Sequence, residues 1–301
     1  MSDATREPPP RLRVGVVGTG RAGSVLGAAL ARAGHPVVAG YGVSDLSRVR
    51  AEALLPGVAL VPVAEVMARA DLVLLTVPDD ALPELVNGLA DTGQVRPGQL
   101  LMHCSGRYGV AVLAPGTAQG ALPLALHPVM TLTGTSLDLE RLDGAPFGVT
   151  APEPLRPIAE ALVVEMGGEP VWVEEGQRPL YHAALAHGAN HLTTLVLSTL
   201  ELLSAAGVAD PARLVAPLLS AALDNALRIG DAALTGPVAR GDVRTVVAHL
   251  AELDRVSPAA AAAYVALARL TADRALAAGL LPADRAEPLL DVLAGAGQGR
   301  S

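Results

Sequence analysis

The stretch Gly18–Gly23, with the sequence GTGRAG, constrains the fold of this chain more than any other feature. It follows a short apolar run, Leu12 to Val17, and opens an Ala- and Leu-rich stretch, Ser24 to Ala33, which Gly34 ends. A glycine-rich turn between a strand and a helix presents backbone N–H groups and the positive end of the helix to a pyrophosphate. The stretch therefore predicts a dinucleotide-binding βαβ unit. The weaker alternative is that the glycines serve only a tight turn.

Each glycine of this loop has an expected role. Gly18 permits the tight turn, Gly20 lets the backbone approach a pyrophosphate, and Gly23 allows close packing of the helix on the strand. We expect the cofactor to contact all six residues of the loop: Gly18, Thr19, Gly20, Arg21, Ala22 and Gly23.

The expected cofactor is NADP(H) rather than NAD. A site that prefers NAD carries Asp or Glu about 20 residues beyond the loop, at the end of the second strand. Gly40–Val43 occupies that place and contains no carboxylate. Ser44, Ser47 and Arg48 follow, and they suit a 2′-phosphate. The alternative is that Ser44 or Asp45 only caps the second helix.

The first half of the chain alternates between strand-like and helix-like segments, which indicates βαβ units and a mostly parallel, doubly wound sheet. Two helices after the first are expected over Ser44–Leu55 and Leu155–Met166. The expected strands after the first are Pro36–Ala39, Val58–Val61, Asp71–Val77, Gln99–His103, Pro146–Thr150 and Pro170–Val173.

The pattern changes near residue 175, after which apolar-periodic helices replace the strands. Asp210-Pro211 and Ser257-Pro258 each place a capping residue before a proline, as at a helix start, and Gly230 and Gly279 mark helix ends. The predicted fold is an α/β Rossmann domain followed by an all-α C-terminal domain. The predicted divisions are a disordered tail over 1–12, the NADP-binding domain over 13–175, and a helical substrate and dimerisation domain over 176–296.

The amino-acid composition excludes several kinds of catalytic chemistry and several kinds of partner. All 22 basic residues are arginine, so Schiff-base chemistry, a P-loop lysine and any catalytic lysine are excluded. The net charge of −8, without a basic stripe, indicates no nucleic-acid partner. A single cysteine fits a reducing compartment, and no apolar stretch reaches the length of a membrane span. We expect a cytoplasmic protein without a signal peptide and without a membrane partner.

The ends of two expected strands predict the nicotinamide side of the site, because ligands bind beyond the carboxyl edge of an open α/β sheet. Val77 and Pro78 follow one strand, and Cys104, Ser105 and Gly106 follow the next. We expect these five residues to contact the cofactor.

Several segments resemble a group of Rossmann-like proteins, regarded as oxidoreductases, that carry a C-terminal helical domain of unknown function. More distantly, the chain is similar to pyrroline-5-carboxylate reductase, ketopantoate reductase and 6-phosphogluconate dehydrogenase, including the C-terminal domain of the last. The resemblance implies NADP-dependent reduction, a substrate in the cleft between the domains, and dimerisation through the helical domain. The matching segments are Gly18–Gly23, Ala70–Asp80, His103–Gly106, Leu126–Pro128, Tyr181–Ala184, Asn190 and Leu234–Asp242.

Candidate catalytic residues come mainly from the first long helix. The hydroxyacid dehydrogenase and ketopantoate reductase relatives use a lysine one turn before an asparagine, but Ala186 stands one turn before Asn190 here. We expect His182, on the same helix face, to donate a proton and Asn190 to hydrogen-bond the substrate. The alternative is that both serve domain packing. His127 is an alternative acid.

Two other features of the sequence could form part of a site. Arg240 could pair a substrate carboxylate or phosphate, or it could bridge helices. His187 and His191 are spaced i, i+4 but lack a third ligand, so no metal site is expected.

The combined expectation is an NADP-dependent oxidoreductase that reduces a small, ketopantoate-like oxo acid, as a homodimer. One alternative is an imine reductase of the pyrroline-5-carboxylate type, because a protonated imine needs less help from an enzyme acid. Another is a non-catalytic NADPH-binding sensor.

Overall fold

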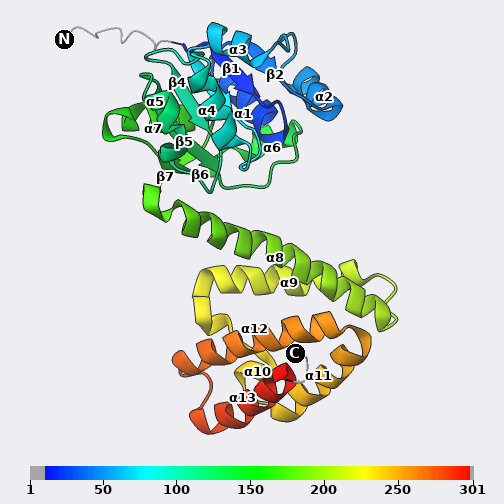
Figure 1. The fold of residues 1–301 in the computed structure, drawn as a ribbon. Helices are drawn as coiled ribbons and strands as arrows, with labels where there is room; N and C mark the ends of the chain where they lie inside the picture. The colour runs from blue at the N-terminus through cyan, green and yellow to red at the C-terminus, as the bar shows by residue number, and fades with distance from the viewer. Residues whose placement is uncertain (1–10, 299–301) are drawn as a thin grey trace, which may run out of the picture. The chain divides into compact units, whose positions relative to one another are not determined.

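A computed structural model of the chain describes residues 11–298, with the side chains described as far as residue 296. The chain divides into two compact units after Gly188 (Figure 1). Helix α8 (Arg178–Ala205) begins shortly after the expected boundary at residue 175 and includes Gly188. Most of the predicted disordered tail (1–10 of 1–12) lies outside the described residues.

A seven-stranded sheet forms the centre of the first unit, in the order β2-β1-β3-β4-β5-β6-β7. All neighbouring strands are parallel except β5 and β6, which are antiparallel. The predicted α/β class with a mostly parallel sheet is confirmed. The strands are β1 (Val14–Val17), β2 (Val37–Tyr41), β3 (Leu72–Leu75), β4 (Leu100–His103), β5 (Leu122–Pro128), β6 (Pro146–Thr150) and β7 (Glu169–Trp172).

Helices cover both faces of the sheet, because alternate strand residues point to opposite sides (Figure 1). Val14 and Val16 of β1 pack with α1 and α7 in one core cluster, whereas Val17 packs with α3 and α4 in the other. Gly15 is required beside α3, since a Cβ there would lie 2.6 Å from the Val66 side chain. The helices are α1 (Arg21–Arg32), α2 (Asp45–Leu54), α3 (Val63–Arg69), α4 (Leu82–Asp91), η1 (Val110–Leu113), α5 (Ala114–Thr117), α6 (Leu137–Arg141), η2 (Glu153–Leu155), α7 (Arg156–Glu165) and η3 (Glu175–Gln177).

The prediction of a strand over Val58–Val61 is wrong. Within this run only Leu60 pairs with β2, through a single bridge to Gly40, and the chain turns away at Pro62, the N-cap of α3. The other expected strands are present with ends shifted by at most two residues.

The second unit is helical, and the described residues from 189 onward contain no strand. The caps predicted at Asp210 and Ser257 are confirmed, because each side chain accepts a hydrogen bond from the backbone N–H three residues on. Asp242 caps α11 in the same way. The helices that follow α8 are α9 (Pro211–Ile229), η4 (Gly230–Ala233), α10 (Gly236–Ala239), α11 (Val243–Val256), α12 (Pro258–Ala277) and α13 (Ala283–Gln298).

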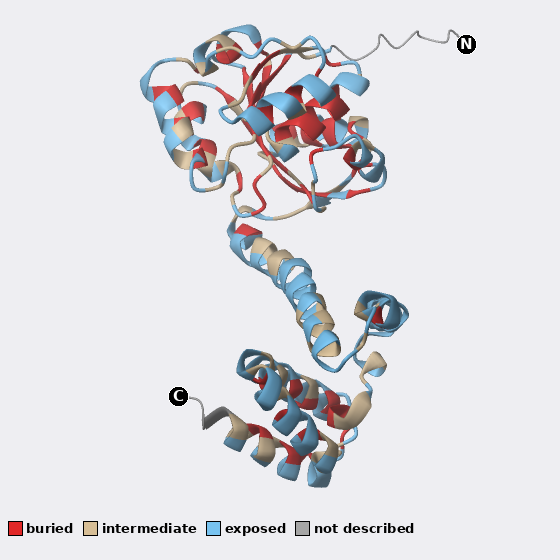
Figure 2. Cartoon of the chain, turned by 90° about the vertical axis from the view of Figure 1, so that its right-hand side faces the viewer, coloured by how far each residue is buried: buried red, intermediate tan, exposed pale blue. Residues whose placement is uncertain are grey.

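The core of the second unit is built by the segment from Leu234 to α13, and neither α8 nor α9 supplies a residue to it. Each of these two helices has one buried residue, Arg178 in α8 and Val215 in α9. Figure 2 shows α8 exposed or partly exposed beyond its buried start. Within residues 11–298, no helix has the length and apolar character that crossing a membrane requires.

Candidate active site at the carboxyl edge of the sheet

Side-chain hydroxyls hold the glycine loop from three directions. Thr76, just after β3, donates through Oγ1 to the carbonyl of Gly18 at 2.7 Å. The buried Thr19 donates to the carbonyl of Ser47 at 3.2 Å, and Ser24 donates to the carbonyl of Thr19 at 3.0 Å. Two of these bonds occupy loop carbonyls, those of Gly18 and Thr19, and the N–H groups of the same two residues donate to the carbonyl of Tyr41. An anion at this loop would therefore be bound by the N–H groups from Gly20 onward.

The three glycines of the loop meet different surroundings. Gly18 has a φ of +103°, which favours glycine. A Cβ on Gly23 would lie 2.1 Å from the carbonyl oxygen of Gly18, whereas a Cβ on Gly20 would meet nothing within 4 Å. The first turn of α1 contains no acidic residue, and no side chain caps it. The loop and the start of α1 therefore fit the pyrophosphate of a dinucleotide, as an open anion site at a helix N-terminus.

The residues expected to distinguish NADP from NAD lie at the start of α2, where one of them caps the helix. Ser44 accepts a hydrogen bond from the N–H of Ser47 at 3.1 Å and caps α2, as one of the two sequence interpretations anticipated. Arg48 is exposed on α2. The sequence analysis missed Arg50, whose Nε would lie 2.7 Å from a Cβ on Gly134, close to the backbone of Arg21. A cavity of about 430 Å³ lies between α2 and residues 133–136 beside this arginine.

His103, at the end of β4, organises the turn that follows it. It is fully buried, its Nε2 donates to the carbonyl of Gly109 at 2.8 Å, and its Nδ1 accepts from the N–H of Ser105 at 3.2 Å. Burial lowers the pKa of His103 to about 4, aided by the charge of Arg178 and opposed by the bond to Gly109 and by Asp79. The ring is therefore neutral at pH 7, with its proton on Nε2.

Two further side chains fix the same turn. Ser105 accepts hydrogen bonds through Oγ from the N–H groups of Arg107 and Tyr108. The carboxylate of Glu175, just before α8, accepts from the N–H groups of Val110 at 2.7 Å and Ala111 at 3.1 Å. Burial raises the pKa of the Cys104 thiol to about 12, so this partly buried thiol is protonated at neutral pH.

The turn faces a cluster of three aromatic side chains. His127, near the end of β5, has its Nδ1 2.8 Å from the hydroxyl of Tyr181, in the first turn of α8. The His182 ring meets that of His127 edge-on, with centroids 6.3 Å apart. A Cβ on Gly106 would lie 2.7 Å from Cδ2 of His182 and 3.0 Å from Nε2 of His127. Gly106 thus leaves both rings room at the carboxyl edge.

Burial lowers the pKa of His127 to about 4, and the nearby charges of Arg178 and His182 lower it further while Asp79 opposes them. Burial raises the pKa of Tyr181, and Arg178 partly offsets that rise. At neutral pH the cluster therefore contains a neutral imidazole bonded to a neutral phenol.

Arg178 is a member of this site that sequence reasoning missed. Its side chain is fully buried and donates to Oγ1 of Thr150 and to the carbonyls of Ala125, Gly148 and Ser105, at 2.8 to 3.3 Å. None of these acceptors is a carboxylate, so a positive charge is held inside the unit by neutral oxygens. Its guanidinium lies 5.7 Å from the ring centroid of Tyr181.

The structure brings together only part of the predicted site. His127, His182, Ser105 and Gly106 are neighbours in the first unit. Asn190 and Arg240 are exposed residues of the second unit, and their expected roles stay predictions. Among residues 11–298, no group of three or more His, Cys, Asp or Glu side chains could hold a metal ion.

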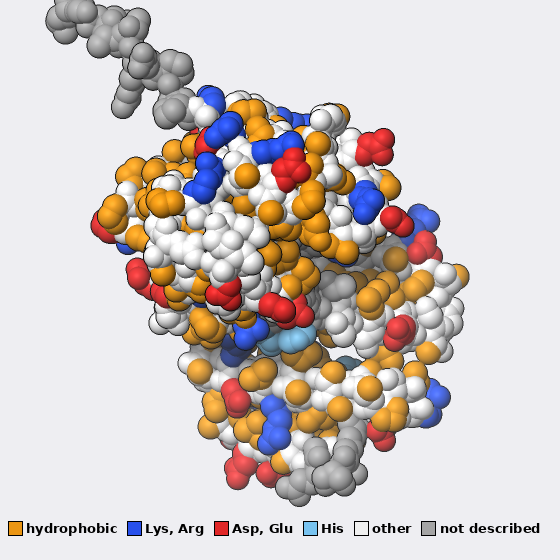
Figure 3. Space-filling view, turned by 45° about the horizontal axis from the view of Figure 1, so that its top comes forward, with side chains coloured by type: hydrophobic (Ala, Val, Ile, Leu, Met, Phe, Trp, Pro, Cys, Tyr) orange, Lys and Arg blue, Asp and Glu red, His pale blue; other side chains and the backbone are white. Residues whose placement is uncertain are grey.

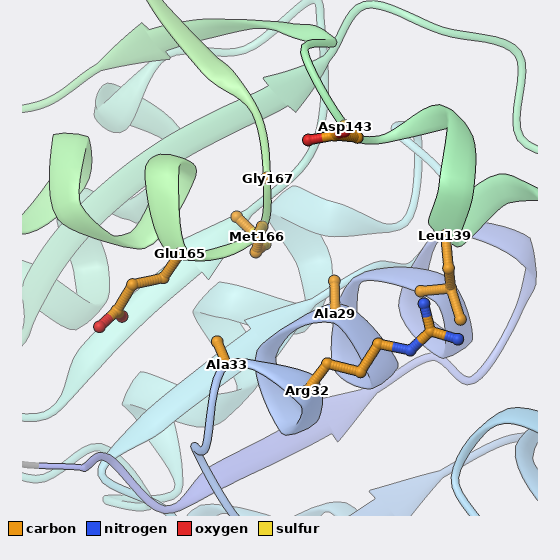
Figure 4. Close-up of a pocket in the computed structure, with 8 residues that line it drawn as sticks. All are labelled: Ala29, Arg32, Ala33, Leu139, Asp143, Glu165, Met166 and Gly167. Atoms are coloured by element: carbon orange, nitrogen blue, oxygen red, sulfur yellow. The ribbon is translucent and has the colours of Figure 1, made fainter.

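A second cavity, of about 220 Å³, lies at the other end of α1, where α7 ends (Figure 4). Arg32 extends toward Leu139 there, and Glu165 turns aside to pair with His35 and Arg11. This cavity lies away from the carboxyl edge of the sheet. The residues that line it do not form a pair of catalytic acid and base groups.

The fold is that of an α/β protein with a glycine-rich loop after β1 and a helical C-terminal region. Residues 2–128 match the Rossmann-like domain family, and residues 145–271 match a domain of unknown function, DUF2520. The chain is therefore a Rossmann-like protein with a C-terminal DUF2520 domain. A search of curated proteins found no match.

Several solved structures share this fold at low sequence identity. A presumed NADP oxidoreductase from Bacteroides fragilis aligns with a TM-score of 0.74 and 21% identity, over 87% of this chain and 98% of its own. An imine reductase from Pseudomonas aligns at 0.66 and 23%, over 90% and 96%. A reductive aminase from Aspergillus terreus aligns at 0.62 and 18%, over 94% and 99%.

Proposed function

We propose that this protein is an NADP-dependent oxidoreductase that reduces the carbonyl of a small, ketopantoate-like oxo acid. The observation that carries the proposal is the shared carboxyl edge of the sheet, which bears an open phosphate loop after β1 and the His127, Tyr181 and His182 cluster beyond β5. Three strand spacings of about 4.8 Å separate β1 from β5. An extended dinucleotide bound at the loop would span such a distance along the edge.

The residues around the loop fit a nicotinamide dinucleotide with a 2′-phosphate. The loop and the start of α1 would hold the pyrophosphate, and Arg48 would pair with the 2′-phosphate, with Arg50 as a further cation nearby. Residues after β3 and β4, including Val77, Pro78 and Ser105, would lie beside the nicotinamide. When bound, the reduced cofactor would supply a hydride.

The remaining site residues are assigned roles in catalysis. A carbonyl that receives hydride needs a proton donor for its oxygen, and His182 and His127 are the candidates in the cluster. Asn190 would hydrogen-bond the substrate, and Arg240 would pair its carboxylate. Reduction of an imine is the second candidate, because no lysine supplies the acid that carbonyl-reducing relatives use.

Comparing NADPH and NADH binding tests the first requirement of this function. We expect the purified protein to bind NADPH at least tenfold more tightly than NADH. Arg48→Ala should weaken NADPH binding, by about 1–2 kcal/mol for one charge-assisted contact, and leave NADH binding unchanged. Fluorescence titration of both nucleotides measures this.

Arg32→Ala, at the opposite end of α1, is the matched control and should bind NADPH like the wild type. If Arg48→Ala weakened NADPH and NADH binding equally, Arg48 would not be the partner of the 2′-phosphate. Absence of binding by the wild type would refute the enzyme assignment. With binding established, oxo acids and imines are screened with NADPH, and His182→Ala shows whether His182 is the acid.

A further inference from the structure

We infer that Tyr181 and His127 form a proton relay, beside the buried cation of Arg178, which serves a substrate that becomes an oxyanion on reduction. The inference rests on the proposed function and deepens it, because it selects a carbonyl substrate over a cationic imine.

The hydrogen bond between His127 and Tyr181 determines which ring nitrogen of His127 carries the proton. A neutral imidazole has one donor nitrogen and one acceptor nitrogen. Nδ1 lies 2.8 Å from the Tyr181 hydroxyl, and a phenol O–H is a good donor to an imidazole nitrogen. We therefore assign the hydroxyl as the donor and place the His127 proton on Nε2. Nε2 has no hydrogen-bond partner among residues 11–298, and Gly106 leaves it space.

The Tyr181–His127 pair lies beside the buried positive charge of Arg178. Arg178 is held by a hydroxyl and three backbone carbonyls, and its side chain lies against Tyr181. The closest carboxylate along the chain, that of Glu175, is already bonded to two backbone N–H groups. The other ionisable groups that act on His127 are His182, His103 and Asp79. A buried positive charge therefore disfavours a cation at the pair and favours an anion.

A bound reduced nicotinamide cofactor would supply the hydride to the carbonyl carbon, which would leave the electron pair of the C=O π bond on the oxygen as an alkoxide. That alkoxide takes the Nε2 proton of His127, while Nδ1 accepts the hydroxyl proton of Tyr181. A tyrosinate remains beside Arg178 and is reprotonated by water. The transfer is favourable because an alkoxide is a much stronger base than a phenolate, and the raised pKa of Tyr181 narrows this difference without reversing it.

The same geometry disfavours an iminium substrate. An iminium ion carries a positive charge before reduction and becomes a neutral amine by hydride addition, so it needs no proton in that step. The buried charge of Arg178 would repel it, whereas the charge would stabilise the developing alkoxide of a carbonyl substrate. The site therefore favours oxo compounds.

Nitrogen NMR of ¹⁵N-histidine-labelled protein tests the pair without requiring turnover. At pH 7 the His127 signals, assigned with His127→Gln, should report a neutral ring protonated on Nε2. In Tyr181→Phe, the Nδ1 signal should shift as its hydrogen bond is lost. Tyr264→Phe is the matched control, because the Tyr264 hydroxyl also lies 3.1 Å from Nδ1 of a histidine, His249, in the helical unit. It should leave His127 unchanged.

Kinetics supply the second readout. Tyr181→Phe should lower kcat for carbonyl reduction roughly 100-fold and leave the Kd for NADPH unchanged. Its turnover of an imine substrate, where detectable, should change less than threefold. Arg178→Lys, which keeps the charge, should retain more activity than Arg178→Gln.

Different results would overturn the proton relay and the proposed oxidoreductase function. A His127 proton on Nδ1, or a Tyr181→Phe variant with unchanged His127 signals and unchanged kcat, would overturn the relay. Wild-type protein without NADPH binding would overturn the proposed function, while the histidine signals would still decide the hydrogen-bond direction.

Discussion

At the scale of single residues, the site depends on polar groups buried with specific partners. His103 illustrates this, because both of its ring nitrogens are bonded to backbone, to Gly109 and Ser105. Protonation would convert Nδ1 from an acceptor to a donor facing the N–H of Ser105. A neutral His103 is thus a requirement of the turn that carries Gly106.

This requirement predicts a pH dependence of stability. The pKa of His103 is about 4 when folded and about 6.5 when unfolded, so the unfolded chain binds the extra proton first as the pH falls. The stability contribution is complete above pH 6.5 and is lost between pH 6.5 and 4, by up to about 3 kcal/mol.

Urea unfolding between pH 4.5 and 7.5 measures the effect. His103→Gln, which keeps an amide donor for Gly109 but does not titrate, should show a shallower pH dependence of the unfolding free energy. An equal slope in the variant and the wild type would contradict the assignment.

At the scale of elements, sequence periodicity predicted the strands that alternate regularly with helices and missed β5 (Leu122–Pro128). Its two prolines suggest a loop, yet they fit the sheet. Leu122 donates to Gln99 on the β4 side, so the nitrogen of Pro123 faces β6, which pairs with β5 only from Ala125 onward. A missing N–H costs nothing where no partner strand is present.

The candidate site was predictable where a local motif marks it and unpredictable where distant elements meet. The glycine loop and the residues after β3 and β4 follow from local sequence. Arg178 does not, because an arginine at a helix start is ordinarily a surface residue. Only the approach of Ala125, Gly148 and Ser105, from three different segments, makes it a buried cation.

The junction before α8 gives a prediction at this scale. Glu175 ties the start of η1 to the segment that leads into α8, through two N–H groups of Val110 and Ala111. Glu175→Ala should lower the free energy of unfolding by about 0.5–1.5 kcal/mol, because two partly exposed N–H groups lose their acceptor. Glu174→Ala, one residue earlier, is the control and should change stability by less than about 0.5 kcal/mol. Chemical unfolding measures both, and equal effects would argue against this tie.

At the scale of the whole molecule, α9 and the part of α8 that follows His182 supply no residue to the core clusters of residues 11–298. Leu214, Leu218, Leu223, Leu227 and Ile229 of α9 are each about half exposed or more. Figure 3 shows other apolar side chains, in orange, at the surface. Apolar exposure on this scale ordinarily marks an interface. We propose that a second copy of the chain covers these helices in a homodimer.

Light scattering during size-exclusion chromatography tests the dimer. We expect a mass of twice the 30.5 kDa of one chain. Leu218→Asp with Leu227→Asp should shift the protein toward a monomer, because two charges would be buried in the interface. Leu137→Asp, an exposed leucine on α6, is the control and should leave the mass unchanged. A monomeric wild type would refute the proposal.

The absence of α8 and α9 from every core cluster also bears on how the chain acquires its structure. The α/β unit and the segment from α10 to α13 each enclose a core and can form at a rate independent of protein concentration. In the proposed homodimer, α9 and the exposed part of α8 would be covered by another chain, so the last folding step would be second order in protein. At the low concentration of a newly made chain, that step would limit how soon the dimer is complete.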